Sequence, residues 1–317
     1  MTIPQFQKKI LSWYKTHGRD LPWRRTKDPY KILVSEIMLQ QTQIARVIPK
    51  YKEFLQAFPT FQALAKTPNK KLLKVWAGLG YWRRALFLKE TAKIICGGEN
   101  KLFKSWGVGA APRAKRGEGG KRFGKVLFSK PEDLEKLPGI GHYTARALAC
   151  FAFGNKEAFL DTNIRRVYLH FFFPSTRPEL VERARSGQVS QKVSDKEILP
   201  IAQKALTSLS NHGMPLTYPR ITSREWHYAL FDYGVMVLKD KKINKRSKHY
   251  HKQSKFEGSF RSFRTKVVKF LLERKGNKAA REVVEALLKN SPYPAKEIIS
   301  SLLKDKLVKC SRGYYSL

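Results

Sequence analysis

The chain has 317 residues, with 63 Lys plus Arg against 25 Asp plus Glu, so its net charge at pH 7 is +38. A hydrophobic fraction of 42% provides ample material for a folded core. This charge excludes an acidic or neutral surface and favours a polyanionic partner, with nucleic acid ranked first. The alternative is a solvated lysine-rich face.

Cysteine content and hydropathy indicate the compartment. Cys96, Cys150 and Cys310 are far apart in the sequence, so they predict neither a disulfide framework nor a clustered metal site. The amino terminus carries charges every few residues, and no window reaches the roughly 18 apolar residues that a membrane span needs. We therefore expect a soluble intracellular monomer without a membrane partner, cytoplasmic and nucleoid-associated if it is bacterial.

Helical spacing recurs along the chain and strand-like alternation is scarce, which predicts a mainly α protein. Asp28 followed by Pro29 is a strong helix start, and the run YKILVSEIMLQQTQIARVI behind it is apolar on more than one face. This run predicts a buried helix. Further helices are expected near residues 5–16, 47–57, 60–66, 70–77, 82–96, 131–136, 143–153, 163–171, 197–210 and 223–238.

Changes in composition divide the chain into a core of residues 1–238 and a tail. Within the core, a glycine-rich basic insertion is expected at about 103–125. Residues 239–257 form a second basic stretch and are predicted to be a linker. Residues 258–317 indicate three helices followed by the short strands KLVKC and GYYSL, the order of a winged-helix-like module. Such a module binds either DNA or protein, and the sequence leaves both open.

Glu36 is the carboxylate within the strongest predicted helix. Ile32, Leu33 and Leu39 are three or four residues away and share its side of the helix. Desolvation in such surroundings would raise the pKa of the carboxyl, as a general acid near neutral pH requires. A partly exposed or arginine-paired glutamate is the equal alternative.

A second motif, LPGIGHYTARALACFAFG, covers residues 137–154. Gly139 and Gly141 permit a tight turn directly before a helix, where unpaired amides and the helix dipole favour an anion. On a chain this basic, we expect a DNA backbone phosphate there. A simple turn is the alternative.

Asp161 ends the apolar run AFL and precedes a cationic helix. Aspartate is a good N-cap, so a purely structural role of Asp161 at the start of this helix is one interpretation. Together with Glu36 it would supply two carboxylates in different environments, as glycosidic bond cleavage requires. The sequence does not show whether the two residues meet.

Five segments together resemble one known family. They are LPWRR (21–25), SEIMLQQTQ (35–43), GLGYW (78–82), LPGIGHYTA (137–145) and LDTNIRRV (160–167). In type and order they resemble the adenine DNA glycosylases of the MutY type, within the helix-hairpin-helix DNA glycosylase superfamily. The resemblance covers about residues 5–240 and implies a two-lobed, all-helical glycosylase core.

The resemblance implies roles for individual residues. Glu36 would protonate the adenine ring and Asp161 would stabilise the cationic sugar, with Asn163 and Tyr143 holding the site. The adenine would be flipped out of the duplex. Gln41 and Tyr81 match residues that probe the opposite base, with Thr42 and Leu79 beside them. Positions lining the adenine pocket are matched by Arg19, Trp23, Arg24 and Leu39. Phosphate contacts are expected at Gly139, Gly141 and His142.

Three departures from the family stand out. The family typically holds an iron-sulfur cluster on four cysteines after the helix at 223–238, and no cysteine lies between Cys150 and Cys310. We therefore expect no cofactor and no metal, with the basic stretch from Lys239 replacing the cluster loop. The tail is too short and too helical for the Nudix-like domain that reads 8-oxoguanine in many members. Thr162 and Tyr228 differ from the residues common at those positions.

The sequence thus predicts a monofunctional adenine DNA glycosylase acting on adenine opposite 8-oxoguanine or guanine in double-stranded DNA, in base excision repair. Tyr143 stands where strand-cutting relatives carry a lysine nucleophile, so we expect no strong lyase activity. Two rivals remain at this point: a thymine or uracil mismatch glycosylase on the same fold, and a noncatalytic DNA-binding protein.

Overall fold

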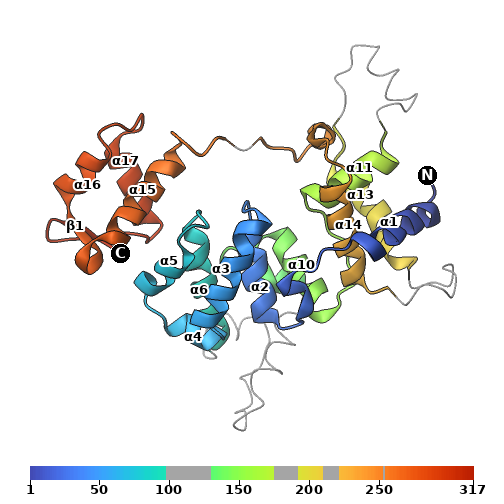
Figure 1. Cartoon of the computed structure of the whole chain (residues 1–317), viewed down its shortest axis with the longest axis horizontal. Helices are drawn as coiled ribbons and strands as arrows, with labels where there is room; N and C mark the ends of the chain where they lie inside the picture. The colour runs from blue at the N-terminus through green and yellow to red at the C-terminus, as the bar shows by residue number, and fades with distance from the viewer. Residues whose placement is uncertain (98–129, 175–191, 210–220, 253) are drawn as a thin grey trace, which may run out of the picture. The chain divides into compact units, whose positions relative to one another are not determined.

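The computed structural model describes residues 1–97, 130–174, 192–209, 221–252 and 254–317. The predicted insertion at about 103–125 lies outside these residues. The chain forms two compact units (Figure 1). Unit 1 comprises residues 1–29, 125–134 and 141–252, and unit 2 comprises residues 30–124, 135–140 and 253–317. Among the described residues, no helix is long and apolar enough to span a membrane.

Unit 1 is helical. Its elements are α1 (Ile3–His17), the 3-10 helix η1 (Pro22–Arg25), α9 (Pro131–Leu134), α10 (His142–Phe153), α11 (Thr162–Phe172), α13 (Asp195–Thr207), α14 (Ser223–Met236) and the 3-10 helix η2 (Lys241–Arg246). The core forms where α1 and α11 both pack on α14 (Figure 1). There the fully buried ring of Phe6 lies 5.0 Å from that of Phe172 and 5.6 Å from that of Trp226, both edge-on. Such edge-to-face pairs stabilise the core beyond the contribution of the buried apolar area.

Unit 2 contains the helices that follow Pro29. They are α2 (Pro29–Leu39), α3 (Ile44–Ala57), α4 (Phe61–Lys66), α5 (Asn69–Trp76) and α6 (Arg83–Cys96). Helix α4 packs along α6, and α3 packs on α5. Phe54, Phe58 and Trp76 stack edge-on in this core, and each is at most 1% exposed.

Residues 254–317 form a small module of helices and short strands within unit 2. It contains α15 (Phe260–Glu273), η3 (Lys275–Asn277), β1 (Lys278–Ala280), α16 (Arg281–Leu287), α17 (Ala295–Lys304), β2 (Lys309–Ser311) and β3 (Tyr314–Ser316). The strands form an antiparallel sheet in the order β1-β3-β2. The sequence predicted the last two strands, whereas β1 was missed because Ala279 and Ala280 continue directly into the helical run REVVEALLKN and alanine is not typical of strands.

The helix predicted along the run behind Pro29 is shorter than expected. Helix α2 ends at Leu39 and α3 begins at Ile44, so residues 40–43 form a turn within the predicted helix. Gln41 adopts the left-handed conformation, with φ of 56°. The next helix was predicted to begin near residue 47, which was also wrong. Because the turn ends at residue 43, α3 already begins at Ile44, and it continues through Pro49.

Candidate functional site

Helix α2 carries Glu36 in a buried environment. Every residue from Ile32 to Met38 is buried, and Glu36 itself is 6% exposed. The hydroxyl of Ser35 donates to the carbonyl of Ile32 at 2.7 Å, so it is satisfied within the helix. The structure therefore agrees with the desolvated interpretation of Glu36 rather than with an exposed helix edge.

The turn after α2 and the loop before α6 are joined by Arg84, which is 8% exposed. One terminal nitrogen of its guanidinium donates to the carbonyls of Ile37 (2.8 Å), Met38 (3.0 Å) and Gln40. The other donates to the hydroxyl of Thr42 (3.1 Å) and to two carbonyls of the second loop, those of Leu79 (3.1 Å) and Gly80 (3.2 Å). Burial lowers the pKa of Arg84 to about 10, so the group stays cationic near neutral pH.

The two loops present the residues that the resemblance assigned to the opposite base. Gln41 is exposed and Tyr81 is partly exposed, and both have positive φ, 56° and 46°. A non-glycine residue in this conformation costs free energy and persists only when its surroundings fix it. Arg84 binds both loops and therefore explains how they are held. No motif in the sequence indicates this role of Arg84.

The hairpin turn has the geometry that its glycines predict. Gly139 has φ of 75°, and a Cβ atom there would lie 2.8 Å from the Cβ of Phe87. Gly141 precedes α10, whose first turn leaves amide groups outside the intrahelical ladder. His142 is exposed at this end, and its Nδ1 accepts from Arg146 at 2.7 Å. The turn can therefore receive an anion such as a phosphate.

In unit 1, Asp161 caps α11. Its Oδ1 accepts the backbone N–H groups of Asn163 (2.9 Å) and Ile164 (2.6 Å), and its Oδ2 accepts the Asn163 side-chain amide at 2.8 Å. Burial raises the pKa of the Asp161 carboxyl above its ordinary value, and these three bonds only partly offset the effect. The N-cap role and a functional carboxylate are therefore both compatible with this geometry.

Aromatic side chains from α10, from α14 and from the segment just before Asp161 pack against one another in unit 1. The partly exposed ring of Tyr143 packs edge-on against Phe159 (5.6 Å) and Phe231 (6.5 Å). Phe159 in turn stacks on the imidazole of His227 at 4.0 Å. The Nδ1 of His227 donates to the Ser223 carbonyl, and burial lowers the pKa of this histidine to about 4.

Arg19 and Arg24 both pair with Asp232, a residue that no sequence motif singles out. Asp232, on α14, is fully buried and receives both guanidinium groups at 2.6 to 2.7 Å. Burial alone would raise the pKa of Asp232, but the bonds from Arg24 and Arg19 outweigh burial and lower it. Asp232 balances one of the two positive charges, and Arg24 also stacks over Tyr228 at 4.3 Å. Both arginines are thus held in place inside unit 1 by their hydrogen bonds to Asp232.

The remaining residues predicted to line the site, Trp23, Leu79 and Leu39, are buried or partly exposed. Trp23, in η1, is 4% exposed, and its carbonyl accepts from Arg224 at 3.3 Å. Leu79 is 3% exposed, and Leu39, at the end of α2, is partly exposed. Glu36 belongs to unit 2 and Asp161 to unit 1, so the structure describes each half of the candidate site by itself.

The segment expected to replace the cluster loop contains η2. Arg166 of α11 donates to Asn244 of η2 at 3.0 Å and to the carbonyls of Gly234 and Leu238. The residues present do not fit a four-cysteine cluster, because the whole sequence has three cysteines. Cys150 is buried beside His227, whereas Cys96 and Cys310 belong to unit 2. Among the described residues, no three His, Cys, Asp or Glu side chains form a potential metal site.

Comparison with known proteins defines the class. The profile of the family described as "HhH-GPD superfamily base excision DNA repair protein" matches residues 34–206, more than half of the chain. The chain therefore belongs to the HhH-GPD superfamily of base excision DNA repair proteins.

Individual relatives narrow the comparison. Over 238 residues the chain is 35% identical to an adenine DNA glycosylase of Buchnera aphidicola, covering 75% of this chain and 54% of that protein. It is 37% identical to the human adenine DNA glycosylase over 174 residues, 52% of this chain and 28% of that one. A solved thermostable thymine-DNA glycosylase superposes with a TM-score of 0.51 and 25% identity, covering 78% of this chain and 96% of that one. The chain thus spans about half or less of the length of these adenine glycosylases.

Proposed function

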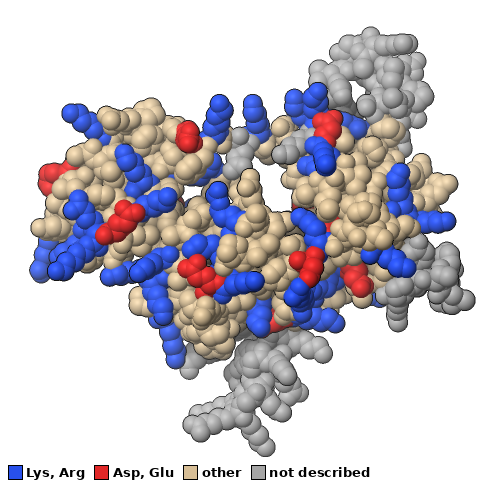
Figure 2. Space-filling view, in the orientation of Figure 1, with Lys and Arg blue, Asp and Glu red and all other residues tan. Residues whose placement is uncertain are grey.

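We propose that this protein is a monofunctional adenine DNA glycosylase that removes mispaired adenine from duplex DNA. The observation that carries the proposal is the buried Glu36 on α2, within a motif of the adenine-glycosylase type. The identity to adenine DNA glycosylases supports it. Substrate strands would be attracted by the net charge of +38. Figure 2 shows Lys and Arg side chains scattered widely over the described part of the visible face, with fewer Asp and Glu among them.

The mechanism follows from the two carboxyl groups. Glu36, kept from water, donates a proton to a ring nitrogen of the flipped adenine, so that the base leaves as a neutral molecule. Asp161 stabilises the positive charge that develops on the sugar while the N-glycosidic bond breaks. Water then adds to the sugar carbon and leaves an abasic site. Asn163 fixes the orientation of the Asp161 carboxylate through its side-chain amide.

Two features support hydrolysis without strand cleavage and without a cluster. Tyr143 cannot form the Schiff base that a lyase mechanism requires. Three cysteines cannot provide four thiolate ligands, and a docked η2 stands after α14 instead. Borohydride reduction during reaction should trap no covalent DNA adduct, and the purified protein should contain no stoichiometric iron by metal analysis. A strong covalent adduct would refute hydrolysis without strand cleavage. A bound iron-sulfur cluster would refute the proposal that the protein has none.

Adenine release tests the proposal directly. Duplexes with adenine opposite 8-oxoguanine or guanine should lose adenine, whereas duplexes with mismatched thymine or uracil should lose no base. Glu36→Gln keeps the size of the side chain but removes its acidity, and we expect release to fall by about two to four orders of magnitude. Wild-type release by this variant would show that the assigned acid is wrong. Release of thymine in place of adenine would overturn the proposed substrate.

A further inference from the structure

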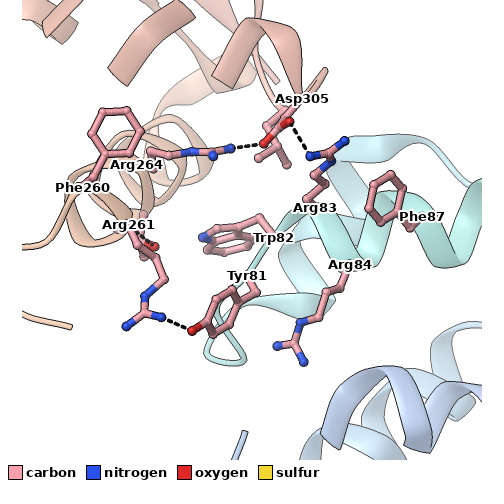
Figure 3. A pocket seen from close by; sticks show the side chains of 11 residues that line it. Tyr81, Trp82, Arg83, Arg84, Phe87, Phe260, Arg261, Arg264 and Asp305 are labelled. Carbon is pink, nitrogen blue, oxygen red and sulfur yellow. Dashed lines mark hydrogen bonds and ion pairs between the residues drawn. The ribbon is translucent and has the colours of Figure 1, made fainter. Parts of the chain in front are cut away.

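A cavity of about 390 Å³ lies within unit 2, between the beginning of α6 and the carboxyl-terminal module (Figure 3). Tyr81, Trp82 and Phe87 line it from the α6 side, and Phe260 and Leu307 line it from the module. Its volume is within the range of about 300–1,000 Å³ that is usual for small-molecule and cofactor sites.

The charged groups of this cavity are mostly cationic. Arg83, Arg84, Arg261 and Arg264 line it against a single carboxylate, Asp305. Arg264 and Arg83 both pair with Asp305, the latter at 3.3 Å (Figure 3). The positive charge therefore exceeds what Asp305 balances, which favours an anionic ligand.

Three residues that line the cavity carry a buried donor with no acceptor among the described residues. These donors are the indole N–H of Trp82, a residue that is only 3% exposed, and the Nε–H groups of Arg84 and Arg261. A buried donor without an acceptor costs free energy, so such groups indicate a missing partner. The cavity thus offers N–H groups to a ligand that carries acceptor oxygens or nitrogens.

Tyr81 connects this cavity to the candidate site. The guanidinium of Arg261, on α15, donates to the Tyr81 hydroxyl and also lies 4.6 Å from its ring centre (Figure 3). Tyr81 is on the loop that Arg84 holds next to the turn after α2. Guanidinium groups beside aromatic faces are the combination that binds nucleotides, by phosphate pairing and by stacking.

We propose that this cavity binds a nucleotide of the substrate DNA beside Tyr81, so that the carboxyl-terminal module takes part in substrate recognition. Arg261 and Arg264 contact the phosphate, which replaces Asp305 on Arg264. The base lies against the aromatic side chains and accepts from the indole of Trp82. This inference rests on the proposed function, because that function supplies the DNA.

Equilibrium binding of a fluorescent mispaired duplex tests the site without using catalysis. Arg261→Ala should weaken binding by about tenfold or more, since one charge-assisted phosphate contact is lost. Arg274→Ala removes the same charge from the end of the same helix, away from the cavity lining, and should change the dissociation constant by less than about threefold. Equal effects of the two substitutions would overturn the proposal.

Further variants distinguish the loss of a ligand contact from the loss of folding. Asp305→Asn removes the carboxylate that competes with the phosphate, so binding should become several-fold tighter, a gain that misfolding cannot produce. Glu297→Gln, an exposed site on α17, is its charge-matched control and should have little effect. Trp82→Phe keeps an aromatic ring, although a smaller one, but removes the N–H, and binding should weaken. Unchanged binding in both Asp305→Asn and Trp82→Phe would refute the assignment.

The outcomes separate this inference from the proposed function. If the wild-type protein releases adenine while Arg261→Ala binds like Arg274→Ala, the function stands and the site is wrong. If it releases no adenine but the duplex binds with the expected pattern, the site stands and the function is wrong. Binding of deoxyguanosine monophosphate that needs Arg261, with duplex binding unaffected by the substitution, would assign the cavity to a free nucleotide and overturn the DNA assignment.

Discussion

Asp161 combines a structural role with the proposed chemical role in one side chain. As an N-cap it satisfies two amides of α11, and burial raises its pKa at the same time. An ionised carboxylate with a raised pKa destabilises the folded state above the ordinary pKa of aspartate. The folded protein therefore carries a cost at this position that the proposed reaction requires.

Asp161→Asn should separate these roles. Asparagine still accepts the two backbone amides through its carbonyl oxygen, and the Asn163 side-chain amide can turn to accept from its NH2 group. Because asparagine cannot ionise, the variant should be at least as stable as the wild type at pH 7. The difference should shrink as the pH falls through the folded-state pKa, and adenine release should be lost. Thermal unfolding at several pH values together with a release assay checks this. A variant that is clearly less stable at pH 7, or that still releases adenine, would contradict the assigned roles.

His227 should make the stability of unit 1 depend on pH. Its pKa is about 4 in the folded protein against 6.5 in the ordinary state, because burial disfavours the charged imidazole. Stability is therefore fully present above pH 6.5 and decreases as the pH falls toward 4, by about 3 kcal/mol. Denaturant unfolding of wild type and His227→Gln across this range measures the contribution. The variant should show a flatter dependence, and equal slopes would contradict the prediction.

At the scale of elements, close contact between two helices fixes the position of Asp161. Helix α14 approaches α11 at Gly234, where an added Cβ would lie 2.5 Å from the carbonyl oxygen of Asn163. Neither backbone can accept that distance without moving. The glycine thus permits the approach of α14 to the turn that carries Asn163 and follows Asp161.

Gly234→Ala should therefore disturb both stability and function. We expect a loss of about 1–3 kcal/mol in the free energy of unfolding, together with reduced adenine release, because the first turn of α11 must shift. Val235→Ala, at a neighbouring exposed position of α14, is the control and should change stability by less than about 0.5 kcal/mol. Chemical denaturation of both variants decides the matter. The same small change in each would show that the contact does not fix α11.

Arg84 has a comparable role in unit 2, where it binds the end of α2 and the loop before α6. Six acceptors share its two terminal nitrogens, and they come from segments about 40 residues apart. A buried guanidinium can satisfy so many carbonyls because its donors are arranged in a planar fork. Both left-handed residues, Gln41 and Tyr81, belong to the segments that it holds.

For the whole molecule, the net charge of +38 predicts binding dominated by phosphate contacts. If about 6–10 phosphates are neutralised, affinity for duplex DNA should fall by about three to five orders of magnitude between 50 and 200 mM salt. Binding titrations of the full chain at a series of salt concentrations measure this slope. A dissociation constant that does not change with salt would exclude the nucleic-acid assignment.

The sequence by itself determined the helical class, the order of the motifs, the basic charge and the cysteines that are too few for a cluster. These properties depend on local spacing and on residue chemistry, so they can be predicted from the sequence alone. The N-cap at Asp161 was predictable for that reason, whereas periodicity left a buried and a partly exposed Glu36 equally open.

Only the tertiary structure decided which partners these residues meet. The pairing of Asp232 with Arg19 and Arg24 joins positions more than 200 residues apart, and Arg261 reaches Tyr81 across 180 residues. No local pattern specifies such contacts, because many arginines in this chain could satisfy one buried aspartate. The end of α2 at Leu39 was decided in the same way: its last carbonyls are bound by Arg84, a residue that lies on α6.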